Sequence, residues 1–128
     1  MEDNIVLADT PILIDYFRKT EKSNSLLVKL FHQGYIFCIS AITEYEIYSG
    51  ATGSQIAYWD EILKWTRVLA FDQEVVKTAV EINNKLKRKR KQIDLADLFI
   101  AATAIANNLP FATLNKKHFE RIDEINII

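Results

Sequence analysis

The stretch IVLADTPIL (residues 5–13) decides the fold class of this sequence. Its first four residues form an apolar run, as expected for a strand that is buried on both faces of a sheet. The run ends at Asp9, and the next two residues predict the start of a helix, with Thr10 as the N-cap and Pro11 at the first helical position. A buried strand that leads directly into a helix is typical of a parallel sheet covered by helices.

The same alternation continues along the chain. Apolar runs predict three further strands, over residues 35–39, 67–71 and 111–114, and residues 125–128 are a candidate fifth strand. Helices are predicted from residue 10, over residues 23–32, from Ser40 or Thr43 to near Gly50, from a cap at Ser54, from a cap at Asp72, and over residues 94–107. The sequence therefore predicts an α/β protein with a mainly parallel sheet of four or five strands.

The composition is that of an ordinary folded protein. The chain has 128 residues, of which 49% are hydrophobic and 26% charged, so we expect one domain over residues 1–128 with a packed core. The single cysteine, Cys38, lies inside an apolar run and is predicted to be a core residue. Glu2 and Asp3 stand where a signal peptide would be basic, and the longest apolar stretch, residues 95–106, is too short to span a bilayer. We therefore expect a soluble cytoplasmic protein without membrane association.

The charges are unevenly distributed. The formal net charge of −1 excludes a generally basic nucleic-acid binder, yet residues 85–91 form a dense run of lysine and arginine. Such a run can contact phosphates, or it can be a solvated helix end whose cations complement the helix dipole. The sequence leaves both interpretations open.

Acidic residues follow the predicted strands. Asp9 comes directly after the first strand, Glu46 lies on the helix after the second, and Asp97 lies in the first turn of the helix that leads into the fourth. Because the carboxyl ends of parallel strands share one edge of a sheet, these carboxylates are expected to converge, and a cation would relieve their repulsion. Oxygen ligands favour Mg²⁺ or Mn²⁺ over zinc.

Each of these acids also has a purely structural interpretation. Asp9 could cap a helix, Glu46 stands three residues after Thr43 as in a capping box, and Asp97 stands three residues after Asp94 in a helix start. The two histidines, His32 and His118, have no ligand partner at a useful sequence spacing. The sequence contains neither a glycine-rich phosphate loop nor a serine nucleophile elbow.

Four motifs, in order and over nearly the whole chain, resemble those of PIN-domain nucleases, and specifically the VapC-type toxins of bacterial toxin–antitoxin pairs. The motifs are LADTPILID (residues 7–15), ISAITEYEIYSG (39–50), DLFIAATA (97–104) and FATLNKKHF (111–119). Each is short, and their specificity comes from their order within a matching α/β frame. The resemblance implies a PIN-like three-layer α/β/α fold.

The resemblance also implies the metal ligands. Asp9, Glu46 and Asp97 match the family's acidic positions, and the spacing from Thr43 selects Glu46 rather than Glu44. Asn115 stands where many members have an aspartate, which leaves it a candidate to bind a metal-bound water or to orient Asp97, and which weakens the case for a second tightly held cation. Three acids are alternative candidates to complete the site: Asp94, Glu120 and Asp123.

The activity implied by the resemblance is hydrolysis of RNA with Mg²⁺ or Mn²⁺, with Asp9, Glu46, Asp97 and Asn115 as the catalytic set. Thr10 and Thr113 are candidates to hydrogen-bond the ligands or the phosphate, and residues 85–91, or Lys116 and Lys117, to hold the RNA backbone. The implied partners are RNA, a cognate antitoxin and a second copy in a homodimer. Three large residues are interface candidates or, as we favour, core residues: Tyr16, Phe17 and Phe31.

Two other functions fit parts of the pattern. A PIN-like RNA- or protein-binding module with a weak or dead site fits the asparagine at position 115. A different α/β enzyme, such as a phosphatase or a response-regulator-like receiver, also gathers acids at strand ends. The paired acids and strand-end lysine of a receiver are not evident, because Asp9 alone directly follows the first strand.

Overall fold

A computed structural model describes residues 4–128, so Glu2 and Asp3 lie outside the described residues. Four strands, β1 (Ile5–Ala8), β2 (Ile36–Ser40), β3 (Arg67–Leu69) and β4 (Phe111–Ala112), form one sheet in the order β3-β2-β1-β4. All three pairings are parallel, and Leu7 of β1 stands opposite Cys38 on one side and Phe111 on the other. The predicted α/β class with a parallel sheet is confirmed.

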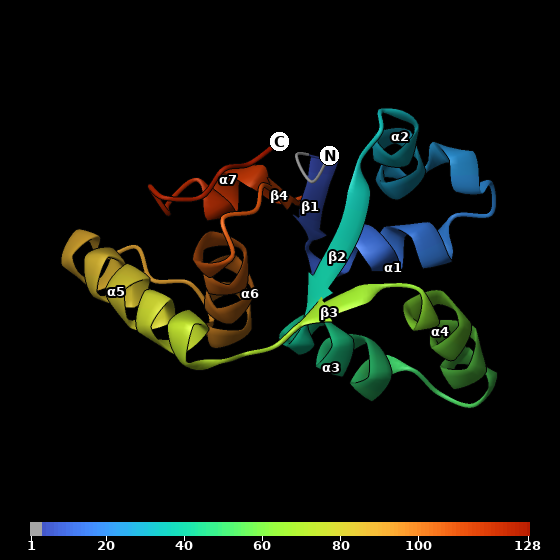
Figure 1. Cartoon of the computed structure of the whole chain (residues 1–128), viewed down its shortest axis with the longest axis horizontal. Coiled ribbons are helices and arrows are strands. Elements are labelled where there is room, and N and C mark those ends of the chain that lie inside the picture. The colour runs from blue at the N-terminus through green and yellow to red at the C-terminus, as the bar shows by residue number, and fades with distance from the viewer. Residues whose placement is uncertain (1–3) are drawn as a thin grey trace.

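The helices cover both faces of the sheet (Figure 1). In chain order they are α1 (Thr10–Arg18), the short 3₁₀ helix η2 (Lys22–Asn24), α2 (Leu26–His32), α3 (Ala41–Gly50), α4 (Ser54–Lys64), α5 (Gln73–Lys89), α6 (Leu95–Ala106) and α7 (Lys116–Phe119). In Figure 1, α5, α6 and α7 lie to one side of the strands, and α1, α2 and α4 lie to the other. Among residues 4–128, every helix is too short or too polar to cross a membrane.

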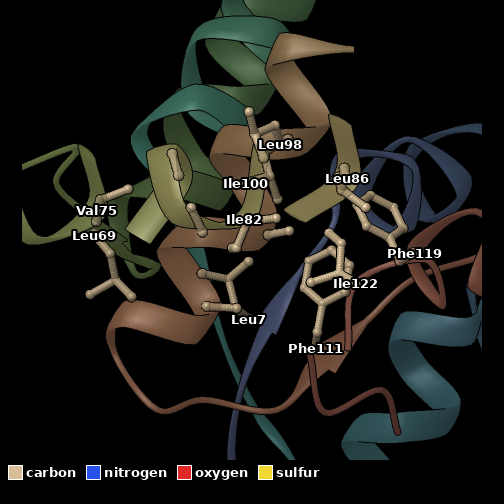
Figure 2. Close-up of a cluster of buried hydrophobic side chains, with 14 of the residues drawn as sticks. Leu7, Leu69, Val75, Ile82, Leu86, Leu98, Ile100, Phe111, Phe119 and Ile122 are labelled. Carbon is tan, nitrogen blue, oxygen red and sulfur yellow. The ribbon is translucent and has the colours of Figure 1, made fainter. Parts of the chain in front are cut away.

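Alternate residues of the central strands pack into hydrophobic cores on the two faces of the sheet, because successive side chains of a strand point to opposite faces. Leu7 and Cys38 belong to the larger core, which they share with α5, α6 and α7 (Figure 2). The next residues, Ala8 and Ile39, belong to the core under α1, α3 and α4. Cys38 is buried, as predicted. The result is a three-layer arrangement with the sheet in the middle.

Two helix starts differ from the sequence predictions. Asp9, not Thr10, is the N-cap of α1, because its side chain accepts a hydrogen bond from the Thr10 backbone nitrogen and Thr10 is already helical. Gly53, not Ser54, precedes α4 with a φ of 50°, a conformation that glycine adopts without strain. Of the two alternatives for α3, Ser40 is the cap, and its Oγ accepts from the Thr43 nitrogen at 3.0 Å.

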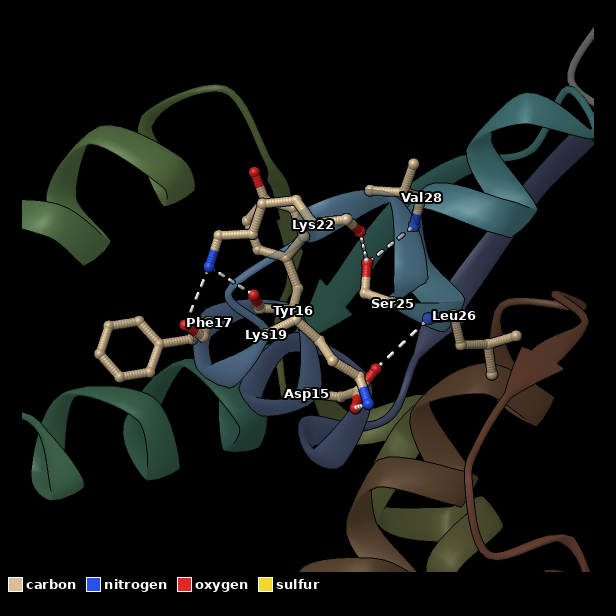
Figure 3. Close-up of polar contacts among 8 residues, drawn as sticks. All are labelled: Asp15, Tyr16, Phe17, Lys19, Lys22, Ser25, Leu26 and Val28. Carbon is tan, nitrogen blue, oxygen red and sulfur yellow. Dashed lines mark hydrogen bonds and ion pairs between the residues drawn. The ribbon is translucent and has the colours of Figure 1, made fainter.

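The helix predicted over residues 23–32 is in fact two pieces. Ser25 interrupts it, because its backbone is extended and its Oγ caps α2 by accepting from the Val28 nitrogen at 3.3 Å. The preceding η2 turn is tied back to α1 by Lys22, whose Nζ donates to the carbonyls of Tyr16 and Phe17 at 2.7 and 2.9 Å (Figure 3). These carbonyls lie in the last turn of α1, where helix acceptors lack an intrahelical partner.

Strand ends are the other point of difference. β3 ends at Leu69 and β4 at Ala112, both earlier than predicted. Within the described residues, 125–128 form no fifth strand, and Ile127 makes a single bridge to Phe111. The four-residue helix α7 was not predicted. Of the interface candidates, Phe17 packs against Trp59 in the second core and Tyr16 is half-buried, whereas Phe31 is 63% exposed.

Candidate active site

Three acidic side chains converge on a pocket of about 330 Å³ at the carboxyl edge of the sheet. Asp9 follows β1, Glu46 comes from the middle of α3, and Asp97 comes from the first turn of α6. The parallel sheet places the ends of β1 and β2 side by side, and α6 packs across them from the other layer. Four further residues complete the lining of the pocket: Thr10, Pro11, Ile14 and Arg18.

Asp9 is fixed at the base of this acidic pocket. Its side chain is 2% exposed, and its two carboxylate oxygens accept from the Thr10 nitrogen and from Thr113 Oγ1, each at 2.9 Å. The pKa of Asp9 is raised to about 6, mainly by burial and also by the charges of Glu46 and Asp94, while the two hydrogen bonds act to lower it. A nearby cation would stabilise the charged form of this buried carboxyl group.

Glu46 is held by a chain of hydroxyl groups. Thr10 Oγ1 donates to Glu46 Oε1 at 2.6 Å and lies 2.9 Å from Thr43 Oγ1. A threonine hydroxyl has one proton, so with Thr10 donating to Glu46, the Thr43 hydroxyl is left to donate to Thr10. Ser40 Oγ then donates to Thr43 Oγ1 at 3.3 Å. Because Ser40 is the helix cap, the capping-box interpretation of Glu46 is wrong, and Glu46 rather than Glu44 lines the pocket.

Asp97 lies against a histidine that the sequence analysis set aside. His118 Nε2 is 3.0 Å from Asp97 Oδ2, and ligand atoms of Asp94, Asp97 and His118 all lie within 4.8 Å of one another. His118 has no ligand partner at a useful sequence spacing, but the fold brings two acids beside it. The pKa of Asp97 is raised to about 7, first by burial and then by the neighbouring acids Asp94, Asp9 and Glu46.

The candidates proposed to complete the acidic site are now separated by position. Asp94 is the one that lies beside Asp97. Asp123 instead forms an ion pair with Lys89 at 2.8 Å, and Glu120 is an exposed residue at the end of α7. Asn115 is exposed, and it lines a neighbouring cavity with His118 rather than the acidic pocket.

Two residues near the pocket differ in how well the sequence predicted them. Thr113 was predicted to bond a ligand or the phosphate, and its hydroxyl donates to Asp9. Arg18, which lines the pocket at the end of α1, was missed because nothing in its sequence context distinguishes it from an ordinary exposed helix residue. Its place beside three acids is visible in the structure alone.

The donor set fits a hard divalent cation. Three carboxylates supply oxygen atoms, and the raised pKa values of Asp9 and Asp97 are the effect expected when acids are buried together without a cation. Metal charge at this point would offset that repulsion. Thr10 and Thr113 hold two of the carboxylates in fixed orientations, as partners of metal ligands commonly do.

Comparison with known proteins identifies the family to which this fold belongs. A family model described as PIN domain matches residues 6–125. The chain belongs to the PIN-domain family. The ribonuclease VapC1 of Methanocaldococcus jannaschii is 36% identical to this PIN domain over 127 residues, which cover 98% of the chain and 87% of that protein.

Solved structures show the same architecture. VapBC2 from Rickettsia felis, bound to a promoter DNA fragment, superimposes on this PIN domain with a TM-score of 0.84 at 25% identity and covers 97% of each chain. DNA-bound VapBC from Salmonella typhimurium gives a TM-score of 0.83 at 25% identity, with 96% of each chain covered. The three-layer arrangement is therefore that of solved VapBC proteins, as the sequence motifs predicted.

Proposed function

We propose that this PIN domain is a divalent-metal-dependent endoribonuclease that acts as the toxin of a toxin–antitoxin pair and inhibits translation by cleaving RNA. The observation that carries the proposal is the convergence of Asp9, Glu46 and Asp97 on one pocket at the carboxyl edge of the sheet. The relatives support the reaction class, since the homologous M. jannaschii protein is named a ribonuclease.

The proposed chemistry follows from the residues of the pocket. Mg²⁺ or Mn²⁺, when bound by Asp9, Glu46 and Asp97, would polarise a phosphodiester and acidify water. Thr113 and Thr10 keep the Asp9 and Glu46 oxygens aimed into the pocket. Glu46 or Asp97 would accept the proton of the attacking water.

The proposed partners are an antitoxin and a second copy of the chain. The matching solved structures are VapBC complexes, which supports an antitoxin as partner. An antitoxin that presents an arginine to the acidic pocket would pair it with the carboxylates. A toxin of this kind acts on RNA inside the cell, so we place it in the cytoplasm.

The proposal is tested by incubating the purified protein with total RNA. We expect fragments with Mg²⁺, and intact RNA with EDTA or with the Asp97→Asn variant, whose fold is checked by circular dichroism. Asp9→Asn should behave in the same way. Asn115→Ala should retain more activity, because Asn115 lies outside the acidic pocket. Full cleavage by a folded Asp97→Asn protein would contradict the assignment.

A second candidate function is a PIN-like RNA- or protein-binding module of low catalytic power. It is favoured by one observation, the neutral and exposed Asn115 at a position where many family members carry an aspartate. This candidate predicts that neither Mg²⁺ nor Mn²⁺ binds near neutral pH. A metal titration therefore separates it from the nuclease.

A further inference from the structure

A second cavity, of about 580 Å³, lies beside the acidic pocket and is lined mainly by basic side chains. We call it the basic cavity, and its lining is Arg90, Lys91, Asn115, Lys117, His118 and Arg121. None of these described residues is acidic. His118 belongs to this lining and also contacts Asp97 of the acidic pocket, so the Asp97–His118 pair marks the boundary between the two cavities.

The cations of the basic run, residues 85–91, have different surroundings. Lys85 pairs with Glu124, and Lys89 pairs with Asp123 at 2.8 Å, so these two cations are already neutralised. Arg90 and Lys91 follow the end of α5 and line the basic cavity instead. The run is therefore more than a solvated helix end, because its last two residues join cations from another part of the chain.

The backbone at Arg90 and Lys91 is held in one conformation, and both side chains are exposed. Arg90 has a φ of 58° and a ψ of 40°, a left-handed conformation in which glycine or asparagine would be less strained. The Lys91 nitrogen donates to the Leu86 carbonyl at 2.9 Å. Arg121 Nη1 donates to the Gln92 carbonyl at 3.3 Å and so links the segment after α7 to the segment after α5.

We propose that the basic cavity binds the phosphodiester backbone of the RNA strand next to the phosphate that is cleaved. The inference rests on the proposed function and adds the path of the substrate, which runs from the acidic pocket past His118 into the basic cavity. Four cationic side chains without an acidic neighbour in the lining match a polyanion, and arginine suits phosphate because it can donate two parallel hydrogen bonds. Contacts of this kind are independent of base sequence.

The test compares two charge-matched double variants. Lys117→Gln with Arg121→Gln removes two exposed cations from the basic cavity. Lys87→Gln with Arg88→Gln removes two exposed cations from the same basic run that neither line the cavity nor form an ion pair within residues 4–128. Binding of a fluorescent single-stranded RNA is measured by anisotropy in EDTA over a range of salt concentrations, so that cleavage does not contribute.

We expect the cavity variant to lower the slope of log affinity against log salt by about 1.4 and the affinity at 0.1 M salt by roughly 25-fold, because each phosphate contact to a single strand contributes about 0.7 to the slope. The control variant should match the wild type. In Mg²⁺, the cavity variant should have a higher KM and an unchanged kcat. This is the effect of losing a contact that binds the substrate and the transition state equally well.

Equal losses in the two double variants would overturn the proposal, because they would indicate a general charge effect rather than a site. Unchanged binding in the cavity variant would overturn it as well. Either result leaves the proposed function standing if the wild type still cleaves RNA with Mg²⁺. Conversely, if RNA binding depends on the basic cavity but RNA is never cleaved, the proposed nuclease activity is contradicted and the proposed RNA-binding site stands.

Discussion

Asp9 shows how one side chain can be both a helix cap and a candidate metal ligand. One of its oxygens accepts from the Thr10 backbone at the start of α1, and the other accepts from Thr113 across the sheet edge. The capping interpretation and the functional interpretation of the sequence are therefore compatible at this position. Asp9 is held in place by its hydrogen bond to the first turn of α1. Because its carboxyl group is buried, its pKa responds to the charges around the pocket.

The Thr113 hydroxyl gives the first prediction. Thr113→Val keeps the shape of the side chain but removes the donor to Asp9, so the pKa of Asp9 should rise further and its carboxylate should lose a fixed orientation. We expect metal affinity to fall by about 10- to 100-fold, as for other partners of metal ligands. The measurement is a Mn²⁺ titration by calorimetry.

The matched control for this prediction is Thr103→Val. Thr103 is also a buried threonine, but its hydroxyl donates to the Phe99 carbonyl within α6. Its replacement should leave metal affinity unchanged. Similar affinities for the two variants would show that the Thr113 hydroxyl does not orient Asp9.

Residues whose position follows from strand order were predictable from the sequence. Asp9, Glu46 and Asp97 were expected to converge, and they line one pocket because parallel strands end at the same edge. The positions of His118 and Asn115 were not predictable in this way, because they depend on α7. That helix has four residues, too few to show a periodic apolar pattern, so nothing indicated which way its side chains point.

Among the secondary-structure elements, η2 and α2 show why one continuous helix was predicted where two pieces exist. The apolar pattern of residues 26–31 is helical, but Ser25 prefers to cap this helix rather than to lie inside it. Lys22 then closes the end of α1 with two hydrogen bonds, and its Nζ lies 4.9 Å from the centre of the Tyr16 ring. The apolar pattern of the sequence does not indicate a side-chain contact of this kind, although its partners are only five and six residues away.

The Lys22 contact gives a prediction about stability. Lys22→Met keeps the aliphatic part of the side chain but leaves the Tyr16 and Phe17 carbonyls without their donor (Figure 3). We expect the free energy of unfolding to fall by about 1.5–3 kcal/mol in urea denaturation, the range for a hydrogen bond that involves a charged group. Lys29→Met, at an exposed position of α2, is the control and should have little effect. Equal effects of the two changes would mean that Lys22 does not secure the end of α1.

For the molecule as a whole, the acidic pocket couples folding stability to pH. Asp9 and Asp97 have pKa values of about 6 and 7 in the folded protein, against 3.8 for an ordinary aspartate. The folded state therefore binds more protons than the unfolded state between about pH 4 and pH 7, so in EDTA the stability should fall as pH rises through this window.

Asp97→Asn should reduce this fall and stabilise the protein at pH 7.5 in EDTA. We expect a gain of about 1–2 kcal/mol, less than the full pKa shift would give, because the Asp97 side chain is 29% exposed and solvent screens part of the repulsion. The measurement is denaturant unfolding at several pH values. A wild-type stability that rises between pH 4 and pH 7 would contradict this account.

The overall architecture was the most predictable level. Strand–helix alternation gave the parallel sheet and its two covering layers, and the family match over residues 6–125 agrees with it. The basic cavity was not predictable, because it combines the end of α5 with residues of and beyond α7. Only the packed chain brings these cations beside the acidic pocket.

Proton release on metal binding tests the central claim, that Asp9, Glu46 and Asp97 together hold a divalent cation, most directly. Mn²⁺ is titrated into the protein by calorimetry at pH 6 in two buffers of different ionisation enthalpy, with Asp9→Asn as the comparison. We predict that the wild type binds Mn²⁺ and releases protons at pH 6, because Asp9 is then about half protonated and Asp97 is mostly protonated, and that it releases fewer at pH 8. Asp9→Asn should bind far more weakly. Absence of binding, or equally tight binding by Asp9→Asn, would contradict the account.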